Sequence, residues 1–267
     1  MEKIKEIFKD RTDIGAKASL AQEMTLFLLG FLGLQVCALL LQLIMEPAFA
    51  SGAINEGQLA MGVNLASYAL LGLVFWLYLI SPFGSGIRQS LKPGSSLHRK
   101  PRGISQGISV FIIIYLVGVL YSGLIELIPW MSTNTNQSTL VTLGSSFPIP
   151  LFIMTVLLAP LIEEITYRGG LTNACAGGFT GAKKSYHPLV GILISSLIFG
   201  LIHFDFQGSI LSATQGDFYP LYRELLNLPA YVISGAALAG CYLASGSLYL
   251  SVALHSLNNL IAFIGMI

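Results

Sequence analysis

The chain has 267 residues and a formal net charge of +1; 54% of its residues are hydrophobic and only 10% are charged. Soluble domains carry about 25% charged residues, so this composition excludes a water-soluble globule and predicts a protein embedded in a lipid bilayer. No basic excess points to a nucleic-acid partner, and none is expected.

Long apolar runs predict an all-α fold, a polytopic bundle of transmembrane helices. A helix needs about 20 mostly apolar residues to cross a hydrocarbon core of about 30 Å. Runs such as 39–41 and 110–113 do not alternate apolar with polar residues, which argues against the strands of a β-barrel. The predicted spans, about seven, are 25–45, 61–83, 106–129, 148–167, 189–206, 228–244 and 247–266.

The segments between these spans carry fewer signals. Residues 1–20 hold charges of both signs and are predicted to form a surface helix, whereas 131–146 is polar and uncharged, as an external connection often is. The sequence Ala-Phe-Ala at 48–50 resembles a signal-peptidase site. The apolar run before it is longer than the roughly 7–15 residues of a signal peptide, so we expect this segment to be retained as a span.

Basic residues predict a cytoplasmic N-terminus, because Lys and Arg favour cytoplasmic connections. With seven spans, all but one of the 14 Lys and Arg residues fall in alternate connections, and Arg223 is the exception. They precede the first span or follow the second and the fourth: Lys3, Lys5, Lys9, Arg11, Lys17, Arg88, Lys92, Arg99, Lys100, Arg102, Arg168, Lys183 and Lys184.

Two further sets of residues are interpreted as packing features. The cysteines, which lack the CxxC spacing of a zinc site, are expected to serve as small apolar side chains; they are Cys37, Cys175 and Cys241. Small residues in the sixth span should let a neighbouring helix approach closely; they are Gly235, Ala236, Ala239 and Gly240.

The fourth span holds ionisable residues that need a reason to lie in lipid, since each costs about 2.5–3.5 kcal/mol on insertion scales. Glu163 and Glu164 are adjacent and so point about 100° apart on a helix. Arg168 follows Glu164 by one turn and can pair with it, which one interpretation treats as an interfacial salt bridge closing the helix end. That interpretation leaves Glu163 without a local partner.

Two histidines and an asparagine lie in later spans. A single histidine in an apolar helix is more often a packing residue, but His203 and His255 occur together with the carboxylate pair. Asn259 lies one turn beyond His255 on the same face. A carboxylate base, imidazoles and an amide donor are the groups needed to activate water against a peptide carbonyl. No GxSxG, P-loop or HExxH motif is present in the sequence.

These residues form three blocks: Glu163-Glu164-Ile-Thr-Tyr-Arg168, Phe199-Gly-Leu-Ile-His203 and His255-Ser-Leu-Asn-Asn259. Together they resemble the EExxxR, FxxxH and HxxxN (or HxxxD) motifs of the CPBP family. This family comprises intramembrane relatives of the CAAX prenyl endopeptidase, including bacteriocin-processing and immunity (Abi) proteins. The resemblance covers about residues 148–264, and residues 246–249 are similar to the short turn that precedes the last motif.

The resemblance implies a division into an N-terminal segment with three accessory spans (1–147) and a catalytic helical core (148–267). It gives the accessory spans no role. In the core it implies that Glu163 and His203 activate water, that His255 and Asn259 stabilise the oxyanion, and that Glu164 and Arg168 shape the site. No obligatory cofactor is expected. The alternative of a zinc-dependent metalloprotease stays open, because two histidines and a glutamate could bind the metal.

The depths of these residues in the bilayer set a further expectation. Counted from the inner boundary, Glu163 lies at about 8 Å, His255 at about 12 Å and His203 at about 22 Å. For the three to meet, residues 185–193 must protrude into the cytoplasm, and the helix must continue past His203 through Phe206 to about Leu211.

The sequence therefore predicts an intramembrane endopeptidase with its site in the cytoplasmic half of a bacterial cytoplasmic membrane. Its partners would be the bilayer and a peptide or protein substrate, such as a leader peptide, a bacteriocin, a signalling peptide or a membrane-protein tail. One alternative is a non-catalytic immunity or regulatory protein of the same fold. A proton-coupled transporter is a second alternative, although no internal repeat supports it.

Overall fold

The computed structural model describes residues 7, 18–91, 101–128, 131, 134–177 and 187–266, and every element in these ranges is a helix. The predicted surface helix at 1–20 lies almost entirely outside the described residues, as do Lys183 and Lys184.

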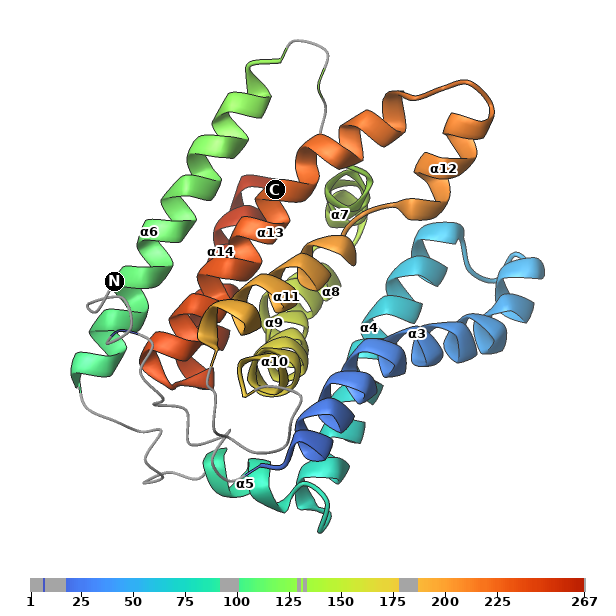
Figure 1. The fold of residues 1–267 in the computed structure, drawn as a ribbon. Coiled ribbons are helices and arrows are strands. Elements are labelled where there is room, and N and C mark those ends of the chain that lie inside the picture. Colours follow the sequence, from blue (N-terminus) through green and yellow to red (C-terminus); the bar gives the residue numbers. More distant parts are fainter. Residues whose placement is uncertain are drawn as a thin grey trace.

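The helices follow one another in a single bundle (Figure 1). The first half of the chain forms α3 (Leu20–Ala50), α4 (Glu56–Ile80), α5 (Ser85–Leu91), α6 (Pro101–Glu126) and α7 (Thr135–Ser146). The next stretch is one long helical rod made of α8 (Pro148–Phe152), η1 (Ile153–Leu158), α9 (Ala159–Glu164), η2 (Ile165–Thr172) and α10 (Asn173–Ala176). The chain ends with α11 (Pro188–Leu201), α12 (Phe206–Thr214), α13 (Tyr219–Ser245) and α14 (Leu248–Met266).

The predicted number of spans is confirmed. Six helices are long and apolar enough to cross a membrane, and the bent pair α11–α12 makes seven if it counts as one span. Three spans are markedly longer than predicted: the first covers Leu20–Ala50, the fourth covers Pro148–Ala176 and the sixth covers Tyr219–Ser245. The extensions of the fourth and sixth spans carry ionisable residues that hydropathy excludes from a span, namely Arg168, Arg223 and Glu224. In the fold, Arg168 and Glu224 are almost completely buried and have polar partners, so they do not face lipid.

The prediction that the helix continues through His203 is wrong. Helix α11 ends at Leu201, and α12 starts at Phe206 in a direction bent by 61°. Asp205 explains the new start, because its carboxylate accepts a hydrogen bond from the Gly208 N–H at 2.9 Å and so caps α12. His203 therefore lies in the bend between two helices instead of inside one.

The segment 131–146, predicted as a polar connection, is also different in the structure. Most of it forms α7, and the side chain of Asn134 caps this helix by accepting the Gln137 N–H at 2.9 Å. The hydroxyls of Ser138, Thr139 and Thr142 bond backbone carbonyls of their own helix, so a sequence rich in Ser and Thr is satisfied in helical form.

Helix α13 is at the centre of the bundle and packs against both α6 and α11. The predicted small residues make this possible. A Cβ on Gly235 would lie 3.0 Å from the Cα of Ser196 in α11, and one on Gly240 would lie 2.9 Å from the side chain of Val110 in α6. The three cysteines are free and buried, in line with a packing role.

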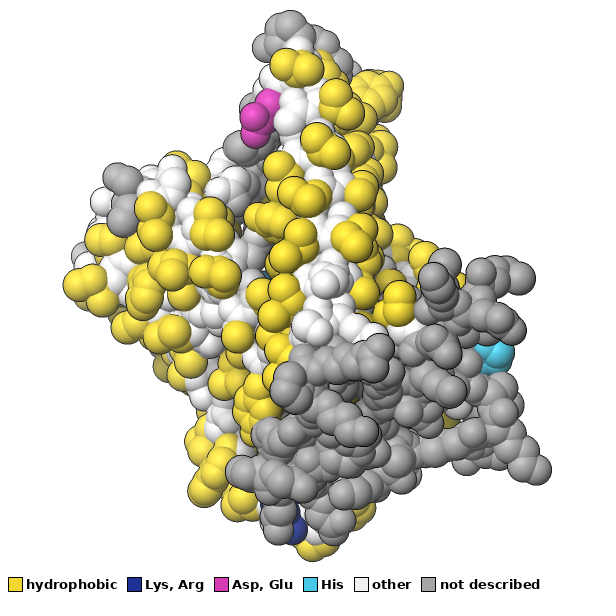
Figure 2. Space-filling model, turned by 90° about the vertical axis from the view of Figure 1, so that its left-hand side faces the viewer, with side chains coloured by type: hydrophobic (Ala, Val, Ile, Leu, Met, Phe, Trp, Pro, Cys, Tyr) yellow, Lys and Arg dark blue, Asp and Glu magenta, His cyan; other side chains and the backbone are white. Residues whose placement is uncertain are grey.

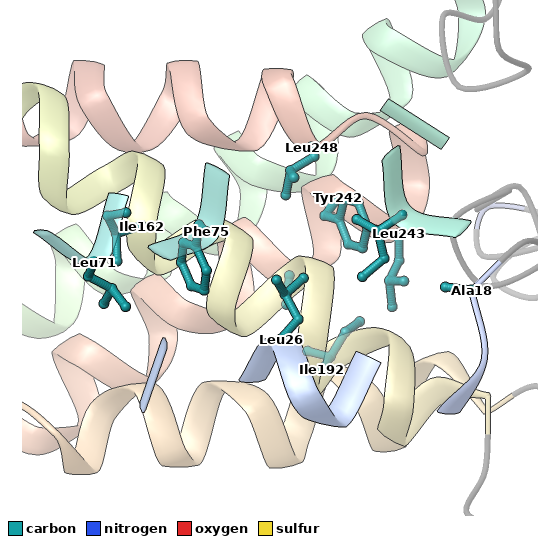
Figure 3. Packing of buried hydrophobic residues seen from close by; sticks show 11 residues of the cluster. Ala18, Leu26, Leu71, Phe75, Ile162, Ile192, Tyr242, Leu243 and Leu248 are labelled. Carbon is teal, nitrogen blue, oxygen red and sulfur yellow. The ribbon is translucent and has the colours of Figure 1, made fainter. Parts of the chain in front are cut away.

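The main apolar core joins the helices that position the site (Figure 3). Its labelled side chains come from six helices, α3, α4, α9, α11, α13 and α14, and from Ala18 just before α3. The helical ones are Leu26, Leu71, Phe75, Ile162, Ile192, Tyr242, Leu243 and Leu248. This core fixes α9, which carries the two glutamates, against both the N-terminal and the C-terminal helices.

The outer face of the bundle is apolar where lipid would contact it. Figure 2 shows one such face, on which yellow hydrophobic side chains dominate the described part of the chain. Helix α6 contributes many of the exposed apolar residues, among them Ile112, Ile113, Leu116 and Leu120. A continuous apolar surface of this kind suits a bilayer and not water.

Candidate active site

The two glutamates lie on α9, a short α-helix between two π-helical segments, η1 and η2. Such wide turns are uncommon and often occur at functional sites. The side chain of Glu164 is fully buried, whereas that of Glu163 keeps 13% of its surface exposed. The two neighbouring carboxylates therefore have different environments, and Glu163 is the one that solvent or a substrate can reach.

Glu164 is the centre of a buried polar cluster. Its carboxylate lies 3.0 Å from Nε of Arg168 and 2.9 Å from Nδ1 of His255, and it accepts a short hydrogen bond from the Ser251 hydroxyl. The predicted Glu164–Arg168 pair is thus present, but it is completely buried instead of interfacial. Burial of an ion pair is tolerated only when further hydrogen bonds compensate for lost hydration, which His255 and Ser251 supply here.

Arg168 also contacts the second motif. Its guanidinium carbon lies 4.8 Å from the ring centre of Phe199, close enough for a cation–π contact. Its Nη2 lies 3.5 Å from the carbonyl oxygen of Gly235 in α13. Arg168 therefore links α11 and α13 to the carboxylate cluster, and this supports the shaping role that the resemblance implies.

His255 joins the two glutamates. A carboxylate can only accept, so Nδ1 of His255 carries the hydrogen that it shares with Glu164. The other ring nitrogen, Nε2, lies 3.8 Å from Oε2 of Glu163. Glu164 thus fixes the orientation of the ring so that Nε2 faces the accessible carboxylate.

Glu163 has a second neighbour that the sequence did not reveal. The hydroxyl of Tyr68, on α4, donates a hydrogen bond to Oε1 of Glu163 at 3.2 Å. Helix α4 belongs to the spans predicted as accessory, so these spans contribute a side chain to the site. One signal was available: a tyrosine hydroxyl inside an apolar span needs a polar partner.

His203, in the bend after α11, lies beside this group. Its Nδ1 is 2.8 Å from the carbonyl oxygen of Phe199 and must donate, so Nε2 of the neutral ring carries the free lone pair. The Phe199 ring contacts both imidazoles, with centroid distances of 4.9 Å to His203 and 6.0 Å to His255.

A tyrosine holds the His203 ring from the other side. The rings of His203 and Tyr231 stack with centroids 4.5 Å apart and planes 15° apart. The Tyr231 hydroxyl in turn donates to Asn134, the residue that caps α7, at 3.2 Å. Tyr231 was not singled out from the sequence because its spacing matches no motif, and only the fold brings it to His203.

Asn259 is placed differently from the other motif residues. Its amide nitrogen donates to the carbonyl oxygen of Thr155 in η1 at 2.8 Å, and its amide oxygen accepts a hydrogen bond from Asn258 at 3.3 Å. The structure therefore brings Glu163, Glu164, Arg168, His203 and His255 into one connected group. Asn259 extends from that group to the backbone of η1.

Glu164 is not free to bind a metal, because its oxygens are paired with Arg168, Ser251 and His255. Each histidine uses only Nδ1 in a hydrogen bond, an arrangement that metal-ligating histidines share. In the described ranges, no three His, Cys, Asp or Glu side chains converge as metal ligands.

Most residues of this site lie in a part of the chain that matches a known protein family. Residues 145–261 match the family described as type II CAAX prenyl endopeptidase Rce1-like. An uncharacterized protein of Mycoplasma capricolum subsp. capricolum is 28% identical over 205 residues, which are 73% of this chain and 52% of that protein. The chain thus spans about half the length of that relative. No solved structure matches the present chain.

The family match confirms the resemblance found in the three motifs. The matched residues include all six motif side chains and end at residue 261, just after Asn259. Residues 145–261 are thus a region of the CPBP type, and the protein is a multi-pass membrane protein. Tyr68 lies outside the matched region.

Proposed function

We propose that this protein is an intramembrane endopeptidase that hydrolyses a peptide bond of a membrane-associated peptide or protein with water activated by glutamate and histidine. One observation carries the proposal. The accessible carboxylate of Glu163 lies between the Tyr68 hydroxyl and His255, whose ring is oriented from behind by the buried Glu164–Arg168 pair.

In the proposed mechanism Glu163 is the general base. A water molecule donates one hydrogen bond to Glu163 and one to the free lone pair on Nε2 of His203. As the water oxygen attacks the scissile carbonyl carbon, its proton passes to Glu163. Glu163 then gives that proton to the leaving nitrogen, and the C–N bond breaks. The products are a new carboxyl terminus and a new amino terminus.

His255 is the proposed electrophile. Its Nε2 faces Glu163 and, when it carries a hydrogen, could donate to the oxyanion that forms on the substrate carbonyl. Tyr68 would hold Glu163 in place during the reaction.

The substrate class follows from the location of the site. The motif residues lie on helices that form candidate membrane spans or on the bend of the α11–α12 pair, so a substrate must reach them from within or along the bilayer. We infer leader peptides, bacteriocins, signalling peptides or membrane-protein tails as substrates, cut in the cytoplasmic half of a bacterial cytoplasmic membrane. The bacterial relative supports this location.

The proposal is tested with purified protein in detergent and a library of membrane-tethered and leader peptides. Wild type, Glu163→Gln and His203→Ala are compared, each with and without a chelator. The matched controls are Glu126→Gln, at the end of α6, and His187→Ala, at the start of α11, which replace an exposed carboxylate and an exposed imidazole outside the site.

We expect cleavage by wild type and by both controls, and loss of cleavage in both site variants. If no peptide is cut, the same variants are tested for function in cells. Full function of Glu163→Gln and His203→Ala there would contradict the peptidase and favour a non-catalytic partner protein of the same fold.

A further inference from the structure

The carbonyl group of Thr155 lacks its helical hydrogen-bond donors. In η1 the N–H of Ala159 donates to Met154, five residues back, so the α-helical donor for Thr155 is used elsewhere. The next donor in this π-helical register is residue 160, which is a proline and has no N–H. Inside a membrane span no water is at hand to bond such a carbonyl, and it needs a partner from another helix.

Asn259 is that partner. Its side-chain amide donates to the Thr155 oxygen at 2.8 Å, across the contact between α14 and η1. His255 lies one turn earlier on α14 and contacts Glu164 and Glu163 on α9. Helix α14 is therefore held against the η1–α9 rod at two levels, one by the imidazole and one by the amide.

We propose that Asn259 is a positioning residue, which bonds the carbonyl left unpaired by Pro160 and thereby sets the position of His255 relative to Glu163. One N–H of its amide then bonds the backbone in the resting enzyme. The expected effect of this hydrogen bond on cleavage rests on the proposed function, whereas its expected effect on the stability of the fold does not.

A rescue experiment separates the positioning role of Asn259 from a direct role of its amide at the oxyanion. Asn259→Leu keeps the approximate volume of the side chain and removes the donor. Pro160→Ala restores a backbone N–H in the register that Ala159 already uses. The double variant has a donor for Thr155 without the asparagine. A second pair, Asn259→Leu with Pro229→Ala, is the matched control, because Pro229 lies inside α13 and its removal provides no donor to η1.

Cleavage and thermal unfolding are measured for each variant. Asn259→Leu should lower kcat about 10- to 100-fold with little change in KM, because a small displacement of a catalytic group has effects of this size. It should also lower the unfolding midpoint by about 3–6 °C, the consequence of one unpaired carbonyl. Addition of Pro160→Ala should restore most of both losses, and addition of Pro229→Ala should not restore kcat.

A double variant as inactive as Asn259→Leu would overturn the positioning role in catalysis and assign the amide to the oxyanion. If wild type cleaves none of the peptides, the cellular test of Glu163→Gln and His203→Ala decides the peptidase proposal, and the unfolding midpoints alone decide this inference. Equal midpoints for Asn259→Leu with and without Pro160→Ala would then contradict it, and a selective recovery would support it.

Discussion

The Nδ1 atom of His255 lies 2.9 Å from the carboxylate of Glu164, while the opposite ring nitrogen faces Glu163. Two adjacent glutamates thus act on one imidazole from different sides. Glu164 is fully buried and is paired with Arg168 and Ser251, whereas Glu163 keeps part of its surface exposed. From this relationship we infer a structural role for Glu164 and a chemical role for Glu163, although they are neighbours in the sequence.

The first prediction is that the two glutamates differ in what their loss affects. Glu164→Gln leaves the charge of Arg168 buried without its partner, which should destabilise the protein by about 3–5 kcal/mol. Glu163→Gln removes a more accessible charge and should leave the unfolding midpoint close to that of wild type while it abolishes cleavage. Thermal unfolding in detergent measures the difference. Equal midpoints for the two variants would contradict the division of roles.

The second prediction concerns Tyr68. The Tyr68→Phe variant keeps the ring and loses only the hydroxyl that donates to Glu163, so kcat should fall about tenfold while KM stays unchanged. The matched control is Tyr78→Phe on the same helix, which removes a hydrogen bond of 3.1 Å to the backbone of Gln22, outside the site. A similar loss of kcat in both variants would show that the effect is not specific to Glu163.

The third prediction concerns the stacked pair of Tyr231 and His203. Tyr231→Leu removes the ring that holds the imidazole and should lower kcat about three- to tenfold, the value of one aromatic pair. Tyr231→Phe keeps the ring and should retain most activity. Tyr115→Leu is the control, because it removes a stacked pair on α6 with centroids 5.3 Å apart and planes 14° apart. Full activity of Tyr231→Leu would exclude a positioning role for the stack.

The fourth prediction concerns metal. Since Glu164 is already paired and no three His, Cys, Asp or Glu side chains converge as metal ligands in the described ranges, we expect cleavage to persist after prolonged dialysis against a chelator. Initial rates before and after dialysis, with and without added zinc, measure this. Activity that disappears on chelation and returns with zinc would contradict the metal-free mechanism and establish the metalloprotease alternative.

Much of this architecture could be predicted because the membrane imposes it. Length and hydropathy identify spans, and ionisable residues within them stand out, which led to Glu163, Glu164, His203 and His255. Their assembly into one group could only be expected from the three motifs taken together. From the depths of the residues we expected a longer helix through His203, whereas the chain bends after α11 and starts a new helix capped by Asp205.

Other parts of the site depend on contacts between distant segments and have no local signal. Tyr68 donates a hydrogen bond to Glu163 although the two residues are 95 positions apart in the sequence. The partner of Asn259 is a backbone carbonyl, which carries no side-chain signature, and its need for a partner depends on a π-helical register next to Pro160. Ser251 is an exception, because it lies four residues before His255, and its position on the same helical face could have indicated it.

Glu163 is proposed to activate the water that hydrolyses a peptide bond. The decisive experiment is cleavage of a membrane-tethered reporter in ¹⁸O-labelled water by wild type, Glu163→Gln and Glu126→Gln in lipid vesicles. Mass spectrometry of the products should show one ¹⁸O atom in the new carboxyl terminus for wild type and Glu126→Gln, and no product for Glu163→Gln. Labelled product at the wild-type rate from Glu163→Gln would contradict the account.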